Sequence, residues 1–214
     1  MLVLYDYYRS SASFRVRIAL HLKGLAYQRS PVQLVRDGGE QHSAPYRRLN
    51  PAGLVPVLSD GSLSISQSLA ILEYLEEVQP EPALLPRAPA DRAWVRSVAL
   101  SIACDVHPLN NLRVLKYLEH ELAASDDARK AWYAHWVEDG LAAVEAMLTQ
   151  RTQTTAFAFG DTPTLADVCI VPQVANALRF ACSLSHVPRI VELYEHCMSL
   201  PEFESASPES VGFS

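Results

Sequence analysis

Hydrophobic and polar positions alternate over short segments in the first third of the chain. Residues 2–7 form an apolar run that is typical of a strand. The next segment, 11–22, repeats apolar residues at helical spacing and is followed by Gly24, a common helix stop. A second strand is expected within 26–34, so the chain begins with a strand, a helix and a strand.

A hairpin and a further helix complete this region. The segment LVPVLSDGSLSIS has two short apolar stretches on either side of Asp60-Gly61, a pair that favours a tight turn between strands. Ser66 can cap a helix whose apolar face is Ile71, Leu72, Leu75 and Val78. With a short turn of helix in the polar segment 35–50, the predicted order is βαβαββα.

The composition changes at residues 79–89. The stretch QPEPALLPRAP holds four prolines in eleven residues, which the interior of a helix or strand does not tolerate. Beyond it we expect helices over 90–120, 127–150, 164–182 and 187–199. We therefore expect a first α/β domain of residues 1–79, a linker of residues 80–89 and an all-α domain of residues 90–214.

Two local signals refine the helical half. Thr164 and Asp167 have the spacing of a capping box, in which the two residues exchange hydrogen bonds at the start of a helix. Pro108 is expected to kink the helix over 90–120, and His107 and Asn111 lie four residues apart on one face of it. A break between helices is expected at 152–163.

Charge and cysteine content restrict the class of protein. The chain has 214 residues, 49% of them hydrophobic, and a net charge of −6, which argues against nucleic acid as the main partner and leaves a small anionic ligand open. No apolar run approaches eighteen residues and the start lacks a basic signal region, so we expect a soluble cytosolic protein without a membrane partner. The four cysteines form no CxxC pair, and no HExxH motif occurs, so we expect no metal site.

Five motifs in order resemble the zeta class of the cytosolic glutathione transferases. SSASFRVRIALHLKG resembles the class signature. NPAGLVPVL resembles the segment that leads into its third strand, and SQSLAILEYLEE resembles its glutathione-binding helix. DVHPLNNLRVLKYL and PQVANALRF resemble further segments of zeta-class maleylacetoacetate and maleylpyruvate isomerases. The resemblance implies a glutathione transferase fold, with a thioredoxin-like first domain and an all-helical second domain, and a homodimer.

The resemblance also implies where glutathione binds. Val55 would exchange backbone hydrogen bonds with the cysteinyl part, with a cis bond before Pro56. Gln67 and Ser68 would place the γ-glutamyl carboxylate at a helix N-terminus, where unpaired N–H groups favour an anion. His42 would contact the glycine end. For Ser68 the alternative is a plain capping role, and for Pro56 an ordinary trans bond.

Catalysis would depend on the turn RSSAS. Ser10 and Ser11 occupy the place where the family has its catalytic hydroxyls, and we expect Ser11 to stabilise the glutathione thiolate and Ser10 to support it. A depression of the thiol pKa by about two units would be worth roughly 2.7 kcal/mol. The alternative is that a serine here only caps the helix. Ala12 stands where the signature commonly has cysteine, a feature that relatives acting on maleylpyruvate can share, and it leaves open an altered substrate preference.

The implied substrate is a dianionic diacid, for which arginine is the favoured ligand because its planar fork donates two parallel bonds. Arg9 and Arg179 are the expected carboxylate ligands, while Arg15 and Arg17 are interpreted as structural or surface ion-pair residues. By resemblance the residues that help close the glutathione and substrate site are Asp105, His107, Asn111 and Arg113.

The expected activity is therefore glutathione-dependent cis-trans isomerisation of a maleyl diacid. One alternative is conjugation or dehalogenation of small electrophiles such as α-halo acids. Another is a glutathione-binding module without catalysis. A thioredoxin-type redox enzyme is excluded because the first turn has no cysteine.

Overall fold

The computed structural model of the chain describes residues 1–151 and 155–212. They form two units of different architecture: Met1–Ala83 together with Ser199–Ser214, and Leu84–Met198. Within the described ranges no helix has the length and apolar character needed to cross a membrane.

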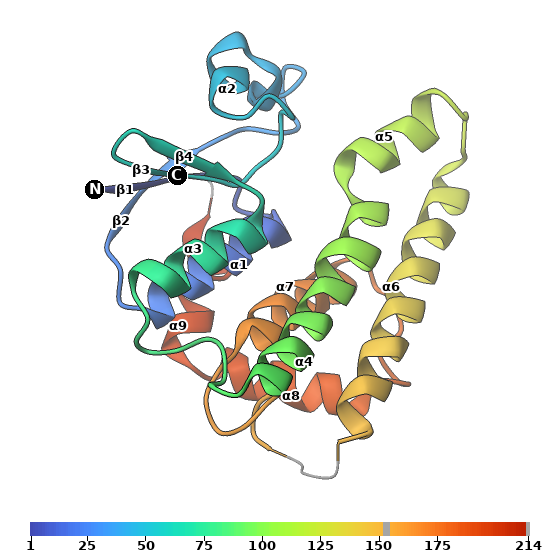
Figure 1. Cartoon of the computed structure of the whole chain (residues 1–214). Helices are drawn as coiled ribbons and strands as arrows, with labels where there is room; N and C mark the ends of the chain where they lie inside the picture. The colour runs from blue at the N-terminus through green and yellow to red at the C-terminus, as the bar shows by residue number, and fades with distance from the viewer. Residues whose placement is uncertain (152–154, 213–214) are drawn as a thin grey trace. The chain divides into compact units, whose positions relative to one another are not determined.

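A four-stranded sheet organises the first unit (Figure 1). The strands are β1 (Leu2–Asp6), β2 (Tyr27–Pro31), β3 (Val57–Asp60) and β4 (Leu63–Ser66), and they lie in the order β2-β1-β3-β4. β1 and β2 are parallel, whereas β3 runs antiparallel to both β1 and β4. With the helices between them, the strands give the predicted order βαβαββα, and the thioredoxin-like fold of this unit is confirmed.

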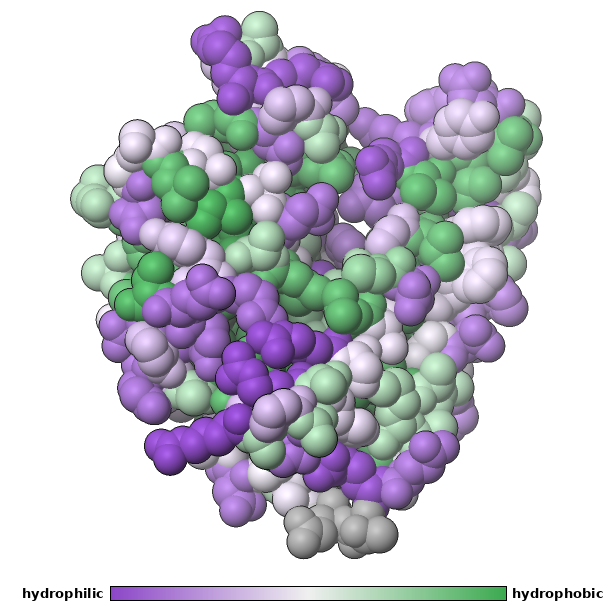
Figure 2. Space-filling view, viewed as in Figure 1, coloured by the Kyte–Doolittle hydropathy of each residue, from purple (hydrophilic) through white to green (hydrophobic). Residues whose placement is uncertain are grey.

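Each face of the sheet is covered by helix. Leu4 of β1 lies opposite Leu58 of β3, and both are fully buried. The next pair, Tyr5 and Val57, points to the other face, where Tyr46 of α2 (Ala44–Leu49) joins their cluster. The helices α1 (Ser11–Leu22) and α3 (Ser68–Val78) pack against each other on the opposite side of the sheet from α2 (Figure 1). Hydrophilic residues gather over α2 and the loop before it (Figure 2).

An ion pair is buried between β1 and α1. Arg17 Nη1 lies 2.6 Å from Asp6 Oδ2, and neither side chain is exposed to solvent. The same guanidinium donates to the carbonyl oxygens of Tyr8, at 3.0 Å, and Ala206, at 2.8 Å. Burial lowers the pKa of Arg17, and the neighbouring Asp6 carboxylate opposes that shift. Arg17 is therefore a structural ion-pair residue, and its pair lies in the core.

The C-terminal segment packs with the first unit, although the sequence led us to place residues 90–214 in one helical domain. Its two short helices are α9 (Pro201–Glu204) and α10 (Pro208–Val211). Besides the Arg17 contact to Ala206, Arg29 of β2 donates to the carbonyl oxygen of Val211 at 3.0 Å. A buried guanidinium, that of Arg17, and a partly exposed one, that of Arg29, thus hold the segment.

The proline-rich stretch is divided between the two units. Lys23 Nζ donates to the carbonyl oxygens of Gln79, at 2.6 Å, and Pro82, at 3.0 Å, in the first unit. Leu84, in the second unit, is 2% exposed, and its carbonyl oxygen accepts from Leu165 N at 2.9 Å. The expected linker 80–89 therefore contacts the first unit at Pro82 and the second unit at Leu84.

Helices form the second unit, as expected. They are α4 (Pro89–Leu100), α5 (Leu112–His120), α6 (Asp126–Thr149), α7 (Leu165–Arg179) and α8 (Pro188–Met198). The expected break at 152–163 begins with residues that lie outside the described ones. The capping box is confirmed: Asp167 Oδ2 accepts from Thr164 N at 2.8 Å, and the Thr164 side chain accepts from the Asp167 backbone.

The expectation of one helix over 90–120 is wrong. After α4 the chain winds into a π-helical segment, Ser101–Val106, and then a 3₁₀ turn, His107–Asn110, before α5 starts. Pro108 accounts for the change, because it has no backbone N–H and its ring collides with the preceding turn of an α-helix. α6 approaches this segment so closely that a Cβ at Gly140 would lie 2.1 Å from Val106 Cγ2.

The buried ion pair makes a prediction about stability. Asp6→Asn keeps the shape of the side chain but leaves Arg17 buried without its counter-charge, so the free energy of unfolding should fall by about 3–5 kcal/mol. Urea denaturation of the purified protein measures it. The control is Lys130→Ala, which removes an exposed pair with Asp126 (side chains 70% and 65% exposed) and should cost less than about 1 kcal/mol. Equal losses in the two variants would contradict the structural role of Asp6.

Candidate active site

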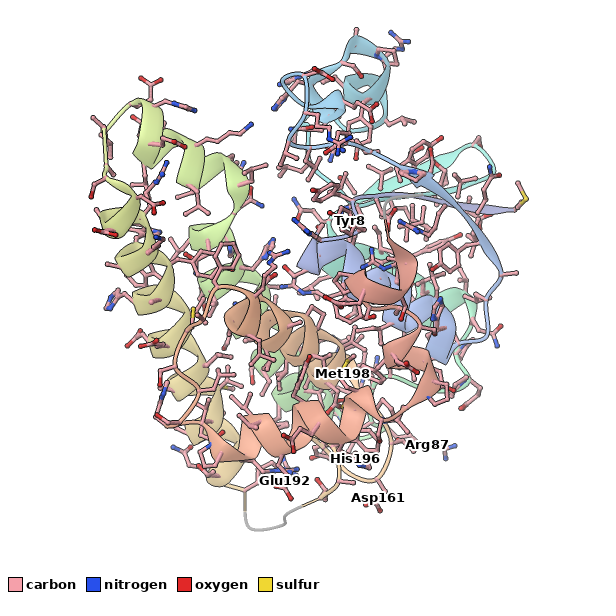
Figure 3. All side chains as sticks on the ribbon, turned by 180° about the vertical axis from the view of Figure 1, so that it is seen from behind. Tyr8, Arg87, Asp161, Glu192, His196 and Met198 are labelled. Carbon is pink, nitrogen blue, oxygen red and sulfur yellow. The ribbon has the colours of Figure 1, made fainter. Side chains whose placement is uncertain are left out.

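Three segments of the first unit meet at one end of the sheet. In the strand register, Tyr5 of β1 lies opposite Val57 of β3, and Val57 lies opposite Ser66 of β4. The end of β1, the start of β3 and the end of β4 therefore lie at the same end of the sheet. The turn before α1, the residues Val55 and Pro56, and Gln67 are all next to it in the chain. The register thus gathers the segments that carry Ser10, Ser11, Val55, Pro56, Gln67 and Ser68. Tyr8, labelled in Figure 3, marks the turn between β1 and α1.

Ser10 and Ser11, two of the three serines in RSSAS, have different environments. Ser10 is the N-cap of α1, with φ −74° and ψ 117°, and its Oγ accepts from Ser13 N at 3.2 Å. Ser11 is the first residue of the helix and is 4% exposed. Ser10 therefore has the capping role that the sequence left open for one of the two serines.

The segment before β3 is fixed through the carbonyl of Leu54. That oxygen accepts from Tyr46 Oη and from Asn50 Nδ2, each at 2.8 Å. Burial raises the pKa of Tyr46, so its hydroxyl stays protonated and can donate. The peptide bond between Val55 and Pro56 is cis, which confirms the prediction for this bond.

The start of α3 differs from the expectation that Ser66 caps it. Ser66 is the last residue of β4, and Gln67 takes the N-cap position without a side-chain capping bond. Gln67 has φ 72° and ψ 117°, a left-handed conformation that glutamine rarely adopts. Strained residues of this kind concentrate at ligand sites, where the surrounding structure holds them in place.

Ser68 is held by Arg15, which we interpreted from the sequence as a structural or surface ion-pair residue; the structure shows that it is buried. Ser68 is 6% exposed, and its Oγ accepts from Arg15 Nη1 at 3.2 Å. Arg15, in α1, is 1% exposed. The signal in the sequence was the charged pair Arg15 and Arg17 inside an otherwise apolar helix, because charged residues in such a helix need buried partners.

The electrostatics of this end favour an anion. The N-termini of α1 and α3 both belong to it, and neither helix has an acidic residue in its first turn. Unpaired N–H groups and the helix dipole give each N-terminus a partial positive charge. Arg9, exposed just before Ser10, lies with its guanidinium carbon 5.0 Å from the centroid of the Tyr8 ring.

His42 lies in a short 3₁₀ helix, Glu40–His42, of the same unit. Its Nδ1 is 3.3 Å from Arg47 Nη2, and the side chain is exposed. A Cβ at Gly53 would lie 3.1 Å from the carbonyl oxygen of Gln41 and 3.3 Å from His42 Nδ1. The loop before β3 therefore packs closely beside His42.

The remaining candidates lie on four segments of the second unit. Asp105 belongs to the π-helical segment and His107 to the 3₁₀ turn, while Asn111 is the N-cap of α5 and accepts from Arg113 N at 3.1 Å. His107 and Asn111 therefore do not share one face of a continuous helix, and that expectation is wrong. Arg179 ends α7 and is exposed. The roles of these residues, with Arg113, stay predictions.

Comparison with known proteins defines the class. Residues 9–78 match the family model of the glutathione S-transferase N-terminal domain. A solved holo structure of maleyl pyruvate isomerase, described as a bacterial glutathione S-transferase of the zeta class, superposes with a TM-score of 0.96 and 42% identity and covers 99% of both chains.

Two further relatives agree with this class. The probable maleylacetoacetate isomerase of Vibrio cholerae is 47% identical over 209 residues, which are 98% of this chain and 96% of the relative. A solved maleylacetoacetate isomerase of Methylobacterium extorquens, with bound malonate and glutathione, has a TM-score of 0.94 and 35% identity and covers 98% of both chains. The chain belongs to the zeta class of the glutathione S-transferase family.

The strained backbone at Gln67 can be tested by substitution. Gln67→Gly should raise the free energy of unfolding by about 1 kcal/mol, because glycine adopts positive φ without steric cost. The control is Gln28→Gly in β2, an exposed strand position where glycine should lower stability by about 0.5–1 kcal/mol. Thermal and urea denaturation measure both variants, and a loss of stability in Gln67→Gly would show that its conformation is not strained.

Proposed function

We propose that the protein is a glutathione-dependent cis-trans isomerase of a maleyl diacid, maleylacetoacetate or maleylpyruvate. The observation that carries the proposal is the sheet end at which the N-termini of α1 and α3 meet, with Ser11 in the first turn of α1. Relatives at 42% and 47% identity over nearly the whole chain are isomerases, or probable isomerases, of such diacids.

The residues at this end fit glutathione. Its γ-glutamyl carboxylate suits the N-terminus of α3 with Gln67 and Ser68, because that terminus offers N–H donors and no acidic neighbour. Its cysteinyl backbone suits the backbone of Val55, which precedes β3 and the cis bond to Pro56. Its glycine carboxylate suits His42. From the second unit we propose that Asp105, His107 and Asn111 contribute to the same ligand, on the strength of the family resemblance.

When bound, glutathione supplies a thiolate that adds to the cis double bond of the substrate and leaves again after the resulting single bond has rotated. Ser11 donates a hydrogen bond to the sulfur, and with the α1 N-terminus it lowers the pKa of the thiol; two units would be worth roughly 2.7 kcal/mol. Ser10 supports this arrangement by capping α1. The protein needs no cysteine of its own for this chemistry, which is consistent with Ala12 beside the serines.

Three arginines are proposed to bind the carboxylates of the diacid: Arg9, Arg113 and Arg179. A guanidinium holds a carboxylate through two parallel hydrogen bonds, so it fixes the orientation of the group as well as its position. When one carboxylate is held in place, only the other end of the substrate can rotate.

A direct assay tests the function. Purified protein with glutathione should convert maleylpyruvate or maleylacetoacetate to the trans isomer without net consumption of glutathione, as followed by the change in absorbance of the diacid. A control without glutathione should show no conversion. Turnover of dichloroacetate without any isomerase activity would instead select dehalogenation or conjugation, and binding of glutathione without either reaction would leave a non-catalytic module.

The two serines should separate catalysis from stability. Ser11→Ala should lower kcat by about tenfold to a hundredfold, because the thiolate loses its hydroxyl donor, with little change in stability. Ser10→Ala should lower the free energy of unfolding by about 1 kcal/mol, because α1 loses its N-cap. Steady-state kinetics and urea denaturation of both variants make the comparison. Full activity of Ser11→Ala would overturn its assignment.

A further inference from the structure

Arg179 lies at an exposed helix end, where an arginine side chain without restraining contacts would bind a carboxylate weakly. It is the last residue of α7 and is exposed, and a long exposed side chain samples many rotamers in solution. A residue that must receive a carboxylate in one geometry gains affinity if that freedom is removed beforehand. Contacts within the second unit restrict this guanidinium.

Two of these contacts come from the same end of α7. Arg179 Nη2 donates to Asn176 Oδ1 at 2.8 Å, one helical turn earlier. The guanidinium carbon lies 4.9 Å from the centroid of the adjacent Phe180 ring, within the range of a cation–π interaction. Both partners are close in sequence, so neither fixes the direction of Arg179 relative to the rest of the unit.

The third contact comes from α6. Tyr133 is 4% exposed, and its ring stacks on Phe180 with the centroids 4.0 Å apart and the planes at 27°. A side-chain hydrogen bond joins Tyr133 and Arg179, in which the guanidinium donates and the phenol oxygen accepts. Burial raises the pKa of Tyr133, so the phenol is neutral at physiological pH and keeps its own proton. Tyr133 thus contacts both Arg179 and the ring that Arg179 lies over.

We propose that Tyr133 is a positioning residue that holds the guanidinium of Arg179 in the orientation that receives a substrate carboxylate. The inference rests on the proposed function, in which Arg179 binds the diacid. A guanidinium has five N–H donors, so bonds to Asn176 and Tyr133 are compatible with a two-bond contact to a carboxylate. Because Tyr133 lies on α6, it ties the end of α7 to a second helix.

Tyr133→Phe tests the inference because it removes only the hydroxyl and retains the stacked ring. It should raise the KM of the diacid by roughly threefold to tenfold, the effect of one lost hydrogen bond, while kcat and the KM of glutathione change less than about twofold. The control is Tyr74→Phe, which removes a phenol bonded to Asp60 Oδ2 at 2.8 Å in the first unit and should leave the KM of the diacid unchanged. An unchanged KM in Tyr133→Phe would overturn the proposal.

A double-mutant cycle separates positioning from general structure. Arg179→Lys should raise the KM of the diacid by about tenfold or more, and Tyr133→Phe should add no further increase in that background. Equal increases in both backgrounds would overturn the positioning role. If Arg179→Lys leaves the KM of the diacid unchanged while the isomerase activity persists, the assignment of Arg179 fails and the proposed function stands. If the wild-type protein has no isomerase activity, the proposed function itself fails.

Discussion

The buried ion pair between Asp6 and Arg17 is the interaction on which the first unit depends. The carboxylate of Asp6 lies at the end of β1, where the chain leaves the sheet for the turn that carries Ser10 and Ser11, and it pairs with Arg17 two turns into α1. Arg17 also donates to the carbonyl oxygen of Tyr8, inside that turn. The ion pair in the core therefore fixes the backbone of the turn through the carbonyl oxygen of Tyr8. The serine hydroxyls of the turn take no part in this ion pair.

The same guanidinium explains why the C-terminal segment could not be placed from the sequence. Arg17 and Ala206 are far apart in the chain, and nothing in the local pattern of residues 199–212 shows that their carbonyl oxygens accept from Arg17 and Arg29. The local signals were sufficient where one short segment determines the structure, as in the Asp60-Gly61 hairpin and the capping box of Thr164, while the cis bond before Pro56 was expected from the family resemblance. They failed where a residue's partners come from a distant element.

The site shows the same division. Motifs that resemble the family indicated the turn before α1 and the start of α3 as parts of the site. A local capping signal was correct at Ser10 but not at Ser66, because Gln67 is the N-cap of α3. The motifs did not show that Gln67 adopts a positive φ or that Arg15 is buried against Ser68, since both depend on how α3 packs on α1. Nor did apolar periodicity reveal the π-helical and 3₁₀ turns after α4, because the hydrophobic pattern continues through Ser101–Val106 while the hydrogen-bond pattern changes.

In two of the proposed carboxylate ligands, Arg9 and Arg179, the guanidinium lies over the ring of a neighbouring aromatic residue, although the two arginines belong to different units. Arg9 lies over the ring of the preceding Tyr8, with its guanidinium carbon 5.0 Å from the centroid, and Arg179 lies over the ring of the following Phe180, at 4.9 Å. An aromatic face restrains a guanidinium without occupying its N–H groups, which point outward in the plane of the fork. An adjacent aromatic residue therefore orients an exposed arginine and leaves its hydrogen-bond donors available. A residue such as Arg17, in which Nε, Nη1 and Nη2 each donate a hydrogen bond within the first unit, is suited to structure. An arginine held by its face keeps the donors that a dianionic substrate requires.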